Sequence, residues 1–432
     1  MEKKAKIKVG IIGTGNCAKS LVEGIQYYIK NPEDKVGLMY EDIGGYKADH
    51  IQFVIGFDVD TRKVNKPLGV ALRAAPNCAM DHVDEIDNTC IAEGAMTYCV
   101  PALDGVAPHM LQYDESVSFR VCKDGEKNAD EIIKLLKDTK VDVLINYLPV
   151  GSEKATRFWI DIAIKAGIHF VNCIPTIIET SETQEVEQRF IDAGLTIVGS
   201  DMRSAWGASR MSEVLQGAML DSGLMITQHI QMNMAAGSTQ GQETIRTGRT
   251  ANTDFLNMAK QERLANKHIS KENVLKGQNI VRDESISGMT LYAGPSLTVQ
   301  QKPGGRYVGS DNKIANFDIV AYGFGGARYE LTARLSVQDS PNSGGVVVSA
   351  IRFCKVASEM GIVGFLRGPS AWTQKTPPLQ LKTEDAKFEC DALSRRVLTD
   401  LTSAQLKNKN PKAKDLPYTF QDSKTDYERS AC

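Results

Sequence analysis

The first half of the chain alternates between short apolar runs and amphipathic segments. The apolar runs lie at residues 7–13, 51–58, 141–148, 168–175 and 195–201. Almost continuously apolar runs are typical of strands buried on both faces of a sheet. Segments with helical spacing follow the first run and lie at 129–139, 151–167 and 182–194. Strand–helix repeats of this kind predict a parallel, doubly wound sheet.

The second half of the chain has a different pattern. A helical segment at 204–222 precedes alternation with a period of two, at 225–234, 314–322 and 329–337. Such alternation is typical of an antiparallel sheet with one buried face. Farther on, we predict a turn at 339–345, a long helix at 346–361 and a helix break at 368–378 that presents Lys375.

Together the two patterns predict an α/β fold with two domains. The first is a Rossmann domain with a doubly wound parallel sheet, and the second is an α+β catalytic and oligomerisation domain with a mainly antiparallel sheet. The predicted limits are 1–200 for the first domain, with about 340–405 packing back on it, 201–339 for the second and 406–432 for a polar tail.

Composition excludes several classes of protein. The 432 residues can bury a large core, and a net charge of -2 argues against a nucleic-acid-binding protein. Nine scattered cysteines without a CxxC pair favour neither a zinc site nor a disulfide framework. We expect the N-terminus to enter a strand directly, without a signal peptide, and no apolar run approaches the roughly 18 residues of a membrane span. We therefore expect a cytoplasmic protein that does not bind membranes.

The turn after the first strand has the pattern Gly13-x-Gly15-x-x-Ala18, with Asn16 and Cys17 between. Between a strand and a helix, this pattern is typical of a dinucleotide site. The first glycine permits the tight turn, the second lets the backbone approach a pyrophosphate, and the alanine permits close packing. The helix N-terminus then faces the anion. An ordinary strand–helix turn is the alternative.

Asp58 ends the second apolar run, where the ribose-binding acid of an NAD site is expected. It comes later than usual because residues 31–49 form an insertion. A carboxylate would repel the 2′-phosphate of NADP, so we expect NAD as the cofactor. A cap at the entry of a helix is the alternative for Asp58.

Polar residues also follow the later strands, at the edge where ligands bind in such sheets. They are Asn146, Ser152, Asn172 and Asp201, and Ser152 is also the predicted cap of the next helix. Cofactor and substrate should meet there. Residues 61–128 are expected to form a short crossover with an excursion near the cofactor, and we assign no chemistry to them.

The stretch from 251 to 275 contains four candidate residues: Asn252, Asp254, Lys267 and Lys271. If a helix spans both lysines, they share a face, although like charges at this spacing destabilise an isolated helix slightly. Helix stability therefore does not require them, whereas a phosphate or a developing oxyanion would. The spacing alone also fits a solvated basic patch.

Eight separated motifs resemble the myo-inositol-1-phosphate synthases, in the short form found in prokaryotes. Over roughly residues 7–380 they are VGIIGTGNCAKSLVEGI, FDVD, LINYLPVGSE, VGSDMRS, NTDFLNM, NKHISK, DSPNSGG and WTQKTPP. The resemblance implies an isomerase of inositol and phospholipid biosynthesis that acts on glucose 6-phosphate. NAD oxidises C5, C6 is deprotonated and adds to the C1 aldehyde, and NADH returns its hydride. A homotetramer joined through the antiparallel sheet is also implied, whereas a monovalent or divalent cation stays open.

The resemblance also implies roles for single residues. Lys267 falls at the C5 oxygen and Lys271 on the phosphate side of the substrate. Lys313, in SDNK, and Lys375, in WTQKTPP, are implied in contacts with the phosphate and the C1 oxygen. Asp339 matches the aspartate that opens the SPNS turn, on the cofactor side.

Two further family segments supply polar groups. Asp201 and Ser204 match the GDDxKS segment, beside the substrate or the nicotinamide. Asn252 and Asp254 match the NxD segment, implied in contacts with hydroxyls and with a metal or the cofactor. Asp201, Ser204 and Asp254 join the four lysines as catalytic candidates.

The chain departs from the family pattern in two places. In GSDMRS, Ser200 replaces an acid and Arg203 a lysine; arginine cannot shuttle protons but can still bind an anion. A longer link, 235–251, brings Arg246 and Arg249 next to the site. This link could be a lid over the phosphate, a subunit contact or a longer surface connection.

Two other functions fit part of the sequence. An ordinary NAD-dependent dehydrogenase of a phosphorylated sugar would explain the first half equally well, although such an enzyme usually needs one base rather than four cations. A non-catalytic NAD-binding homologue would be expected to lack lysines at 267, 271 or 375, and all three are present.

Overall fold

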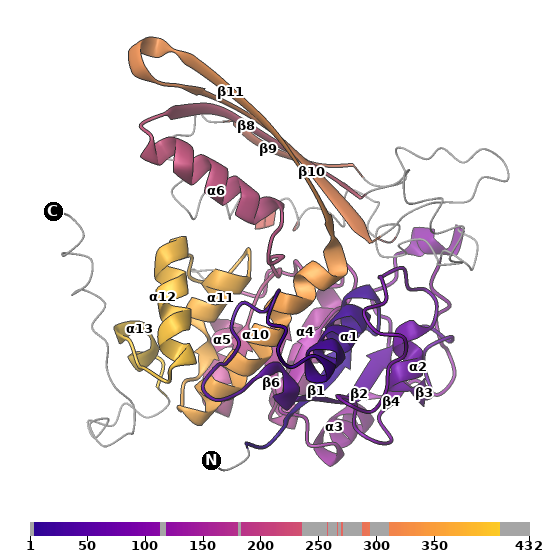
Figure 1. Ribbon diagram of the computed structural model, residues 1–432. Helices are drawn as coiled ribbons and strands as arrows, with labels where there is room; N and C mark the ends of the chain where they lie inside the picture. Colours follow the sequence, from indigo (N-terminus) through magenta and orange to yellow (C-terminus); the bar gives the residue numbers. More distant parts are fainter. Residues whose placement is uncertain are drawn as a thin grey trace.

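The computed structural model describes residues 4–112, 118–179, 183–235, 257, 266, 269–270, 287–293 and 311–406. An eight-stranded sheet carries helices on both faces, and a four-stranded sheet projects from it (Figure 1). Within the described ranges, no disulfide joins the eight cysteines, and no helix is long and apolar enough to cross a membrane. The link beyond residue 235 and the tail beyond 406 lie outside these ranges.

The larger sheet has the doubly wound order that the apolar runs predict: β12-β7-β6-β5-β1-β2-β4-β3. Its strands are β1 (Ile7–Ile12), β2 (Ile51–Asp58), β3 (Lys66–Pro67), β4 (Met96–Cys99), β5 (Val143–Asn146), β6 (His169–Asn172), β7 (Thr196–Val198) and β12 (Gly364–Phe365). Neighbours are parallel except β3 with β4. The order reverses at β1, and ligands bind at such a reversal.

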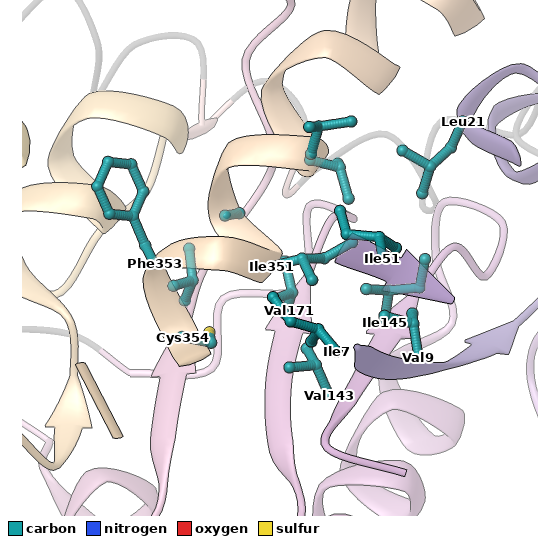
Figure 2. Packing of buried hydrophobic residues seen from close by; sticks show 14 of the residues in the cluster. Ile7, Val9, Leu21, Ile51, Val143, Ile145, Val171, Ile351, Phe353 and Cys354 are labelled. Carbon is teal, nitrogen blue, oxygen red and sulfur yellow. The ribbon is translucent and has the colours of Figure 1, made fainter. Parts of the chain in front are cut away.

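Helices cover this sheet because alternate strand residues point to opposite faces. The helices are α1 (Asn16–Lys30), α2 (Leu68–Arg73), α3 (Ala129–Asp138), α4 (Glu153–Ala166), α5 (Glu185–Ala193), α10 (Asp339–Glu359), α11 (Arg367–Thr373), α12 (Thr383–Ser394) and α13 (Asp400–Ser403). On one face, Val9 and Ile145 belong to the same buried cluster as Leu21 of α1 and Ile351 of α10 (Figure 2). On the other face, Leu144 packs in a cluster with α3 and α4.

The segment 339–345, predicted as a turn, is instead the beginning of α10. Proline is tolerated in the first turn of a helix, so Pro341 does not delay its start. The glycines of this segment permit close packing rather than a turn. A Cβ on Gly345 would lie only 2.7 Å from the carbonyl oxygen of Gly37.

The chain after α10 returns to the larger sheet. Its strand β12 pairs in parallel with β7, and Gly364 aligns with Thr196. The long helix already ends at Glu359, before the break predicted at 368–378, and residues 367–373 form the separate helix α11. Lys375 follows this helix almost directly, in the segment that runs beside the end of β7.

The smaller sheet has the order β11-β10-β8-β9. Its strands are β8 (Met225–Ala235), β9 (Ser287–Ala293), β10 (Asn312–Tyr322) and β11 (Arg328–Gln338). Alternation predicted β8, β10 and β11, but β9 is parallel to β8, so the sheet is mixed. Helix α6 (Ala208–Asp221) packs on this sheet. Its Met219 belongs to the same buried cluster as Ile226 of β8 and Ile319 of β10. This helix begins after residues 204–207 rather than at 204.

Candidate active site

Two adjoining cavities lie where the parallel strands end. The turn cavity, of about 60 Å³, is lined by Gly13, Gly15 and Asp58 among others. The lysine cavity, of about 170 Å³, is lined by Lys313 and Lys375 among others. The two cavities share four lining residues: Asn16, Tyr147, Leu148 and Pro149.

The glycine turn has the geometry that a dinucleotide needs. Gly13 has a φ of +85°, and a Cβ there would lie 2.8 Å from the carbonyl oxygen of Tyr147, so glycine is required. A Cβ on Gly15 would meet no atom within 4 Å, so the backbone is open to a pyrophosphate at the wall of the turn cavity. Ala18 is fully buried, as close packing requires. These residues therefore fit a bound dinucleotide.

Asp58 lies at the tip of β2 and lines the turn cavity. Its Oδ2 accepts hydrogen bonds from Thr14 N at 2.8 Å and Thr14 Oγ1 at 2.7 Å. Its Oδ1 accepts from the backbone amides of Val59, at 2.8 Å, and Asp60, at 3.0 Å. The alternative of a helix-entry cap is wrong, because the next helix begins only at Leu68. Ribose binding by Asp58 stays a prediction.

Asn16 and Cys17, at the start of α1, line the lysine cavity. The Oδ1 of Asn16 accepts from Cys78 N at 2.9 Å, and its Nδ2 donates to Cys78 Sγ at 3.4 Å. The Cys17 thiol lies 3.8 Å from the hydroxyl of Ser340. The first turn of α1 is thereby joined both to the crossover segment and to the first turn of α10.

Three predicted cofactor contacts lie behind the cavity walls. Asn146, Ser152 and Asn172 are fully buried and line neither cavity. Asn146 Nδ2 donates to Asn172 Oδ1 at 2.9 Å, and Asn146 Oδ1 accepts from Leu148 N at 3.1 Å. The Ser152 hydroxyl donates to the carbonyl of Pro149 at 2.5 Å instead of capping α4. The structure therefore supports a role in holding the strand ends, not direct cofactor contact.

Lys375 and Asp201 form an ion pair on the wall of the lysine cavity, although they are 174 residues apart. Lys375 Nζ lies 2.8 Å from Asp201 Oδ1 and donates to the carbonyl of Met202 at 2.9 Å. The two side chains are only 12% and 6% exposed. The backbone amide of Lys375 also donates to the Asp201 carbonyl at 2.8 Å, so the two residues are joined through both their side chains and their backbones.

A second ion pair joins Lys313 and Asp339, with 2.5 Å between Nζ and Oδ2. Burial acts to lower the pKa of Lys313, but the Asp339 carboxylate outweighs burial and the pKa rises above its ordinary value. Asp311 is buried beside this pair and accepts from Ser340 N at 3.0 Å and Ser340 Oγ at 2.6 Å. Burial and the nearby Asp339 raise the pKa of Asp311 to about 7.

The N-terminus of α6 borders the same cavity. Four residues in or just before the first turn of this helix line the cavity: Ser204, Gly207, Ala208 and Ser209. The first amides of a helix lack intrahelical partners, and the helix dipole places partial positive charge there, so this end favours an anion. Ser204, predicted beside the substrate, lies with Lys313 and Lys375 in one cavity.

Three residues that line the lysine cavity each carry a buried polar atom without a hydrogen-bond partner in the described part of the chain. The atoms are the Tyr147 hydroxyl, Asp201 Oδ2 and Asn233 Nδ2. An unpaired buried polar group costs about 1–3 kcal/mol, so such atoms call for an explanation. A polar ligand with several hydroxyls would satisfy them.

Arg203 does not line the lysine cavity, so the expectation that it binds an anion there is wrong. Its guanidinium is buried and pairs through Nη1 with Glu213 of α6. Its Nε donates to the carbonyl of Gln374 at 2.8 Å, immediately before Lys375. Because its charge is taken up by Glu213, Arg203 connects α6 to the segment that carries Lys375.

Four predicted residues lie outside the described part of the chain: Asn252, Asp254, Lys267 and Lys271. Two nearby residues of the same stretch are described. Asn266 donates to Glu153 Oε1, at the start of α4, at 2.6 Å. Ser270 is fully buried and accepts from Thr376 Oγ1 at 2.8 Å. The residue before Lys271 therefore contacts the residue after Lys375.

Sequence reasoning missed three parts of the site. Asp311 stood in the SDNK motif, but nothing in the sequence indicated its burial. Tyr147 lay inside the predicted strand 141–148 and gave no signal of a role in the site, whereas β5 ends one residue before it. Residues 100–106 form one wall of the turn cavity, and Asn257 holds them by accepting from Ala107 N at 2.8 Å. The expected excursion near the cofactor lies here.

The fold and the site define a class of protein. A Rossmann sheet with an open glycine turn and an acid at the tip of β2 is typical of dinucleotide-binding proteins. The adjoining cavity adds two paired lysines and a helix N-terminus, which suit a polar anionic ligand. Among the described residues, no three His, Cys, Asp or Glu side chains converge as metal ligands.

Comparison with known proteins identifies the family. The family model for myo-inositol-1-phosphate synthase matches residues 207–340. An inositol-3-phosphate synthase of Mycobacterium tuberculosis is 33% identical over 394 residues, which cover 90% of this chain and 96% of that protein. One from Corynebacterium glutamicum is 34% identical over 393 residues, 89% of this chain and 97% of that protein. The chain belongs to the myo-inositol-1-phosphate synthase family.

The solved structures agree with the fold. A myo-inositol-1-phosphate synthase-related protein from Thermotoga maritima aligns with a TM-score of 0.67 at 19% identity. The alignment covers 90% of this chain and 98% of that one. At this level of identity the likeness shows the architecture alone.

Proposed function

We propose that the protein is an isomerase that converts D-glucose 6-phosphate to 1D-myo-inositol 3-phosphate, with NAD recycled in each turnover. The observation that carries this proposal is the composition of the lysine cavity. It adjoins the turn cavity, contains two paired lysines and is lined by three residues whose buried polar atoms suit a hydroxylated ligand. The names of the curated relatives support the same activity.

The glycine turn and Asp58 would hold NAD, which supplies a reversible hydride acceptor when bound. The protein groups then act on the sugar. Lys375 Nζ has three N–H donors, and two of them are directed to Asp201 and the Met202 carbonyl. The third can donate to a substrate oxygen, and Asp201 Oδ2 can accept from a sugar hydroxyl. This pair would orient the substrate and stabilise negative charge on its oxygens.

Lys313 suits a different task. Its raised pKa keeps it protonated, so it would stabilise a developing oxyanion rather than remove a proton. Asp311, with a pKa of about 7, is the neighbouring group that can gain or lose a proton near neutral pH. Lys267 and Lys271 keep the roles that the resemblance implies, at the C5 oxygen and on the phosphate side.

The phosphate end of the sugar would lie at the N-terminus of α6. Ser204, Gly207 and Ser209 line this part of the cavity. A phosphate there gains hydrogen bonds from helix amides and the positive end of the helix dipole, in addition to the lysine that the resemblance implies on the phosphate side.

The decisive experiment supplies glucose 6-phosphate with NAD at a small fraction of the sugar concentration. Inositol phosphate in excess of the NAD, without net NADH, is the expected result. Stoichiometric NADH would instead indicate the sugar-phosphate dehydrogenase. NAD binding without any turnover would indicate the non-catalytic homologue.

Assembly and location complete the proposal. We propose a cytoplasmic homotetramer in which the smaller sheet forms the subunit contact, with a product that enters inositol and phospholipid synthesis. The hairpin of β10 and β11 supports the contact, because Tyr322, Phe324 and Tyr329 are exposed there. Light scattering on the purified chain tests the tetramer. A cation requirement is tested by adding a chelator and by exchanging monovalent salts.

A further inference from the structure

The turn 204–207, between β7 and α6, is attached to the first turn of α10 by one side chain. Asn342 Oδ1 accepts from the backbone amide of Trp206 at 2.8 Å, and Asn342 Nδ2 donates to the Trp206 carbonyl at 2.7 Å. The backbone of Asn342 also accepts from Ala205 N at 2.9 Å. The N–H and the C=O of Trp206, which belong to two successive peptide units, are thus fixed by a single side-chain amide.

We propose that Asn342 is a positioning residue that holds the turn 204–207 in the shape in which the N-terminus of α6 takes the substrate phosphate. This inference rests on the proposed function, because the phosphate of glucose 6-phosphate is the anion concerned. Asn342 does not line the lysine cavity, so it acts through the turn and not by contact with the substrate.

The turn needs such a support because little apolar burial holds it. The Trp206 side chain is 48% exposed. The turn is also tight, since a Cβ on Gly207 would lie 2.8 Å from the Ser204 Cβ. A small rotation of the 205–206 peptides would redirect the amides that follow, and anion binding depends strongly on their direction.

Asn342 also links the two ends of the cavity. It lies three residues after Asp339 on α10, so both side chains belong to the same helical face. Asp339 pairs with Lys313, and Ser340 holds Asp311. One rigid helical turn therefore sets the distance between the phosphate end of the substrate and the Lys313 pair.

The test compares two substitutions of similar size. Asn342→Leu removes both side-chain hydrogen bonds, whereas Asn342→Asp keeps an acceptor for Trp206 N and adds a negative charge near the phosphate. Two hydrogen bonds lost should raise the KM for glucose 6-phosphate by about tenfold, with kcat changed less than about twofold. The KM of the aspartate variant should fall on adding salt, because the added charge is screened, and that of the leucine variant should not.

The control is Asn128→Ala, which removes the side-chain cap of α3, a hydrogen bond accepted from Glu131 N at 3.0 Å, far from the cavity. It should lower the melting temperature without changing the KM. Calorimetric binding of NAD checks that the Asn342 variants are folded. Binding of glucose 6-phosphate to the NAD-loaded protein then measures directly how much substrate affinity is lost.

Each outcome decides the matter. If the Asn342 variants bind glucose 6-phosphate as tightly as the natural protein, or lose kcat at unchanged KM, Asn342 is only structural and the inference is wrong. If the natural protein itself neither binds nor converts glucose 6-phosphate, the proposed function fails and this inference fails with it. If the Asn342 variants bind glucose 6-phosphate more weakly but keep their turnover and their NAD affinity, the result supports both the proposed function and this inference.

Discussion

The Lys375–Asp201 pair is the residue contact on which the proposed chemistry depends most. Lys375→Met removes the cation and the N–H that would reach the substrate, so kcat should fall by about 100-fold or more while NAD affinity stays unchanged. The substitution also leaves a carboxylate that is 6% exposed without its partner, which destabilises the fold. Steady-state kinetics and thermal melting together separate the two effects.

A double variant and a remote pair supply the controls for Lys375. Lys375→Met with Asp201→Asn removes both charges, so it should regain much of the lost stability and none of the activity. Lys355→Met breaks a partly exposed pair with Asp142, 3.1 Å apart, that lines neither cavity. It should leave kcat unchanged. Near-normal turnover in Lys375→Met would contradict the assignment of this site.

Asp311 predicts a pH dependence of stability. Burial and then Asp339 raise its folded pKa from 3.8 to about 7, so the folded state holds a proton that the unfolded state has lost. Its contribution to stability is therefore complete below pH 3.8 and is lost as the pH rises to about 7. Asp311→Asn stays neutral, so its free energy of unfolding relative to the natural protein should increase between pH 5 and pH 8.

Urea unfolding at several pH values measures this difference for Asp311. Asp318→Asn serves as the control, because Asp318 is exposed on the same strand, β10. Its difference from the natural protein should be small at every pH. A flat difference for Asp311→Asn as well would mean that Asp311 is ionised throughout this range.

At the scale of elements, α10 depends on glycine where it crosses the loop near residue 37. Gly345→Ala should destabilise the protein by about 1–3 kcal/mol, since the new Cβ would lie 2.7 Å from a backbone oxygen that cannot easily move. Gly217→Ala in α6 is the matched control. Its Cβ would meet no atom within 4 Å, so it should stabilise by about 0.5–1 kcal/mol through helix propensity. Urea unfolding should show changes in the free energy of unfolding of opposite sign for the two variants. Changes of the same sign would contradict this account of the packing.

The strands and helices also show how far sequence patterns predict this fold. Five strands of the larger sheet, β1, β2, β5, β6 and β7, were predicted because burial on both faces leaves continuous apolar runs. The start of α10 was missed because DSPNSGG reads locally as a turn, and only its packing against another segment explains the glycines. Strand β12 has two residues, and its pairing with β7 is set by tertiary contacts that no local pattern records.

At the scale of the whole molecule, the site combines segments that sequence spacing cannot connect. The glycine turn and Asp58 were placed correctly because a local motif specifies them. The pairing of Asp201 with Lys375 spans 174 residues, and that of Lys313 with Asp339 joins a strand to a helix. Local sequence likewise could not show that Asn146 would donate a hydrogen bond to Asn172 behind the cavity wall. Burial, which decides these cases, belongs to the assembled fold.

The turn cavity, which Asp58 lines, leads to a prediction about cofactor choice. NAD at 100 times its dissociation constant should stabilise the folded chain by about 2.7 kcal/mol. NADP at the same concentration should produce little shift in melting temperature, because its 2′-phosphate would approach the Asp58 carboxylate beside the glycine turn. Asp58→Asn removes the charge while keeping one acceptor for Thr14, so the shift with NADP should rise toward that with NAD. Equal shifts with both cofactors in the natural protein would mean that Asp58 holds the glycine turn and does not select the ribose.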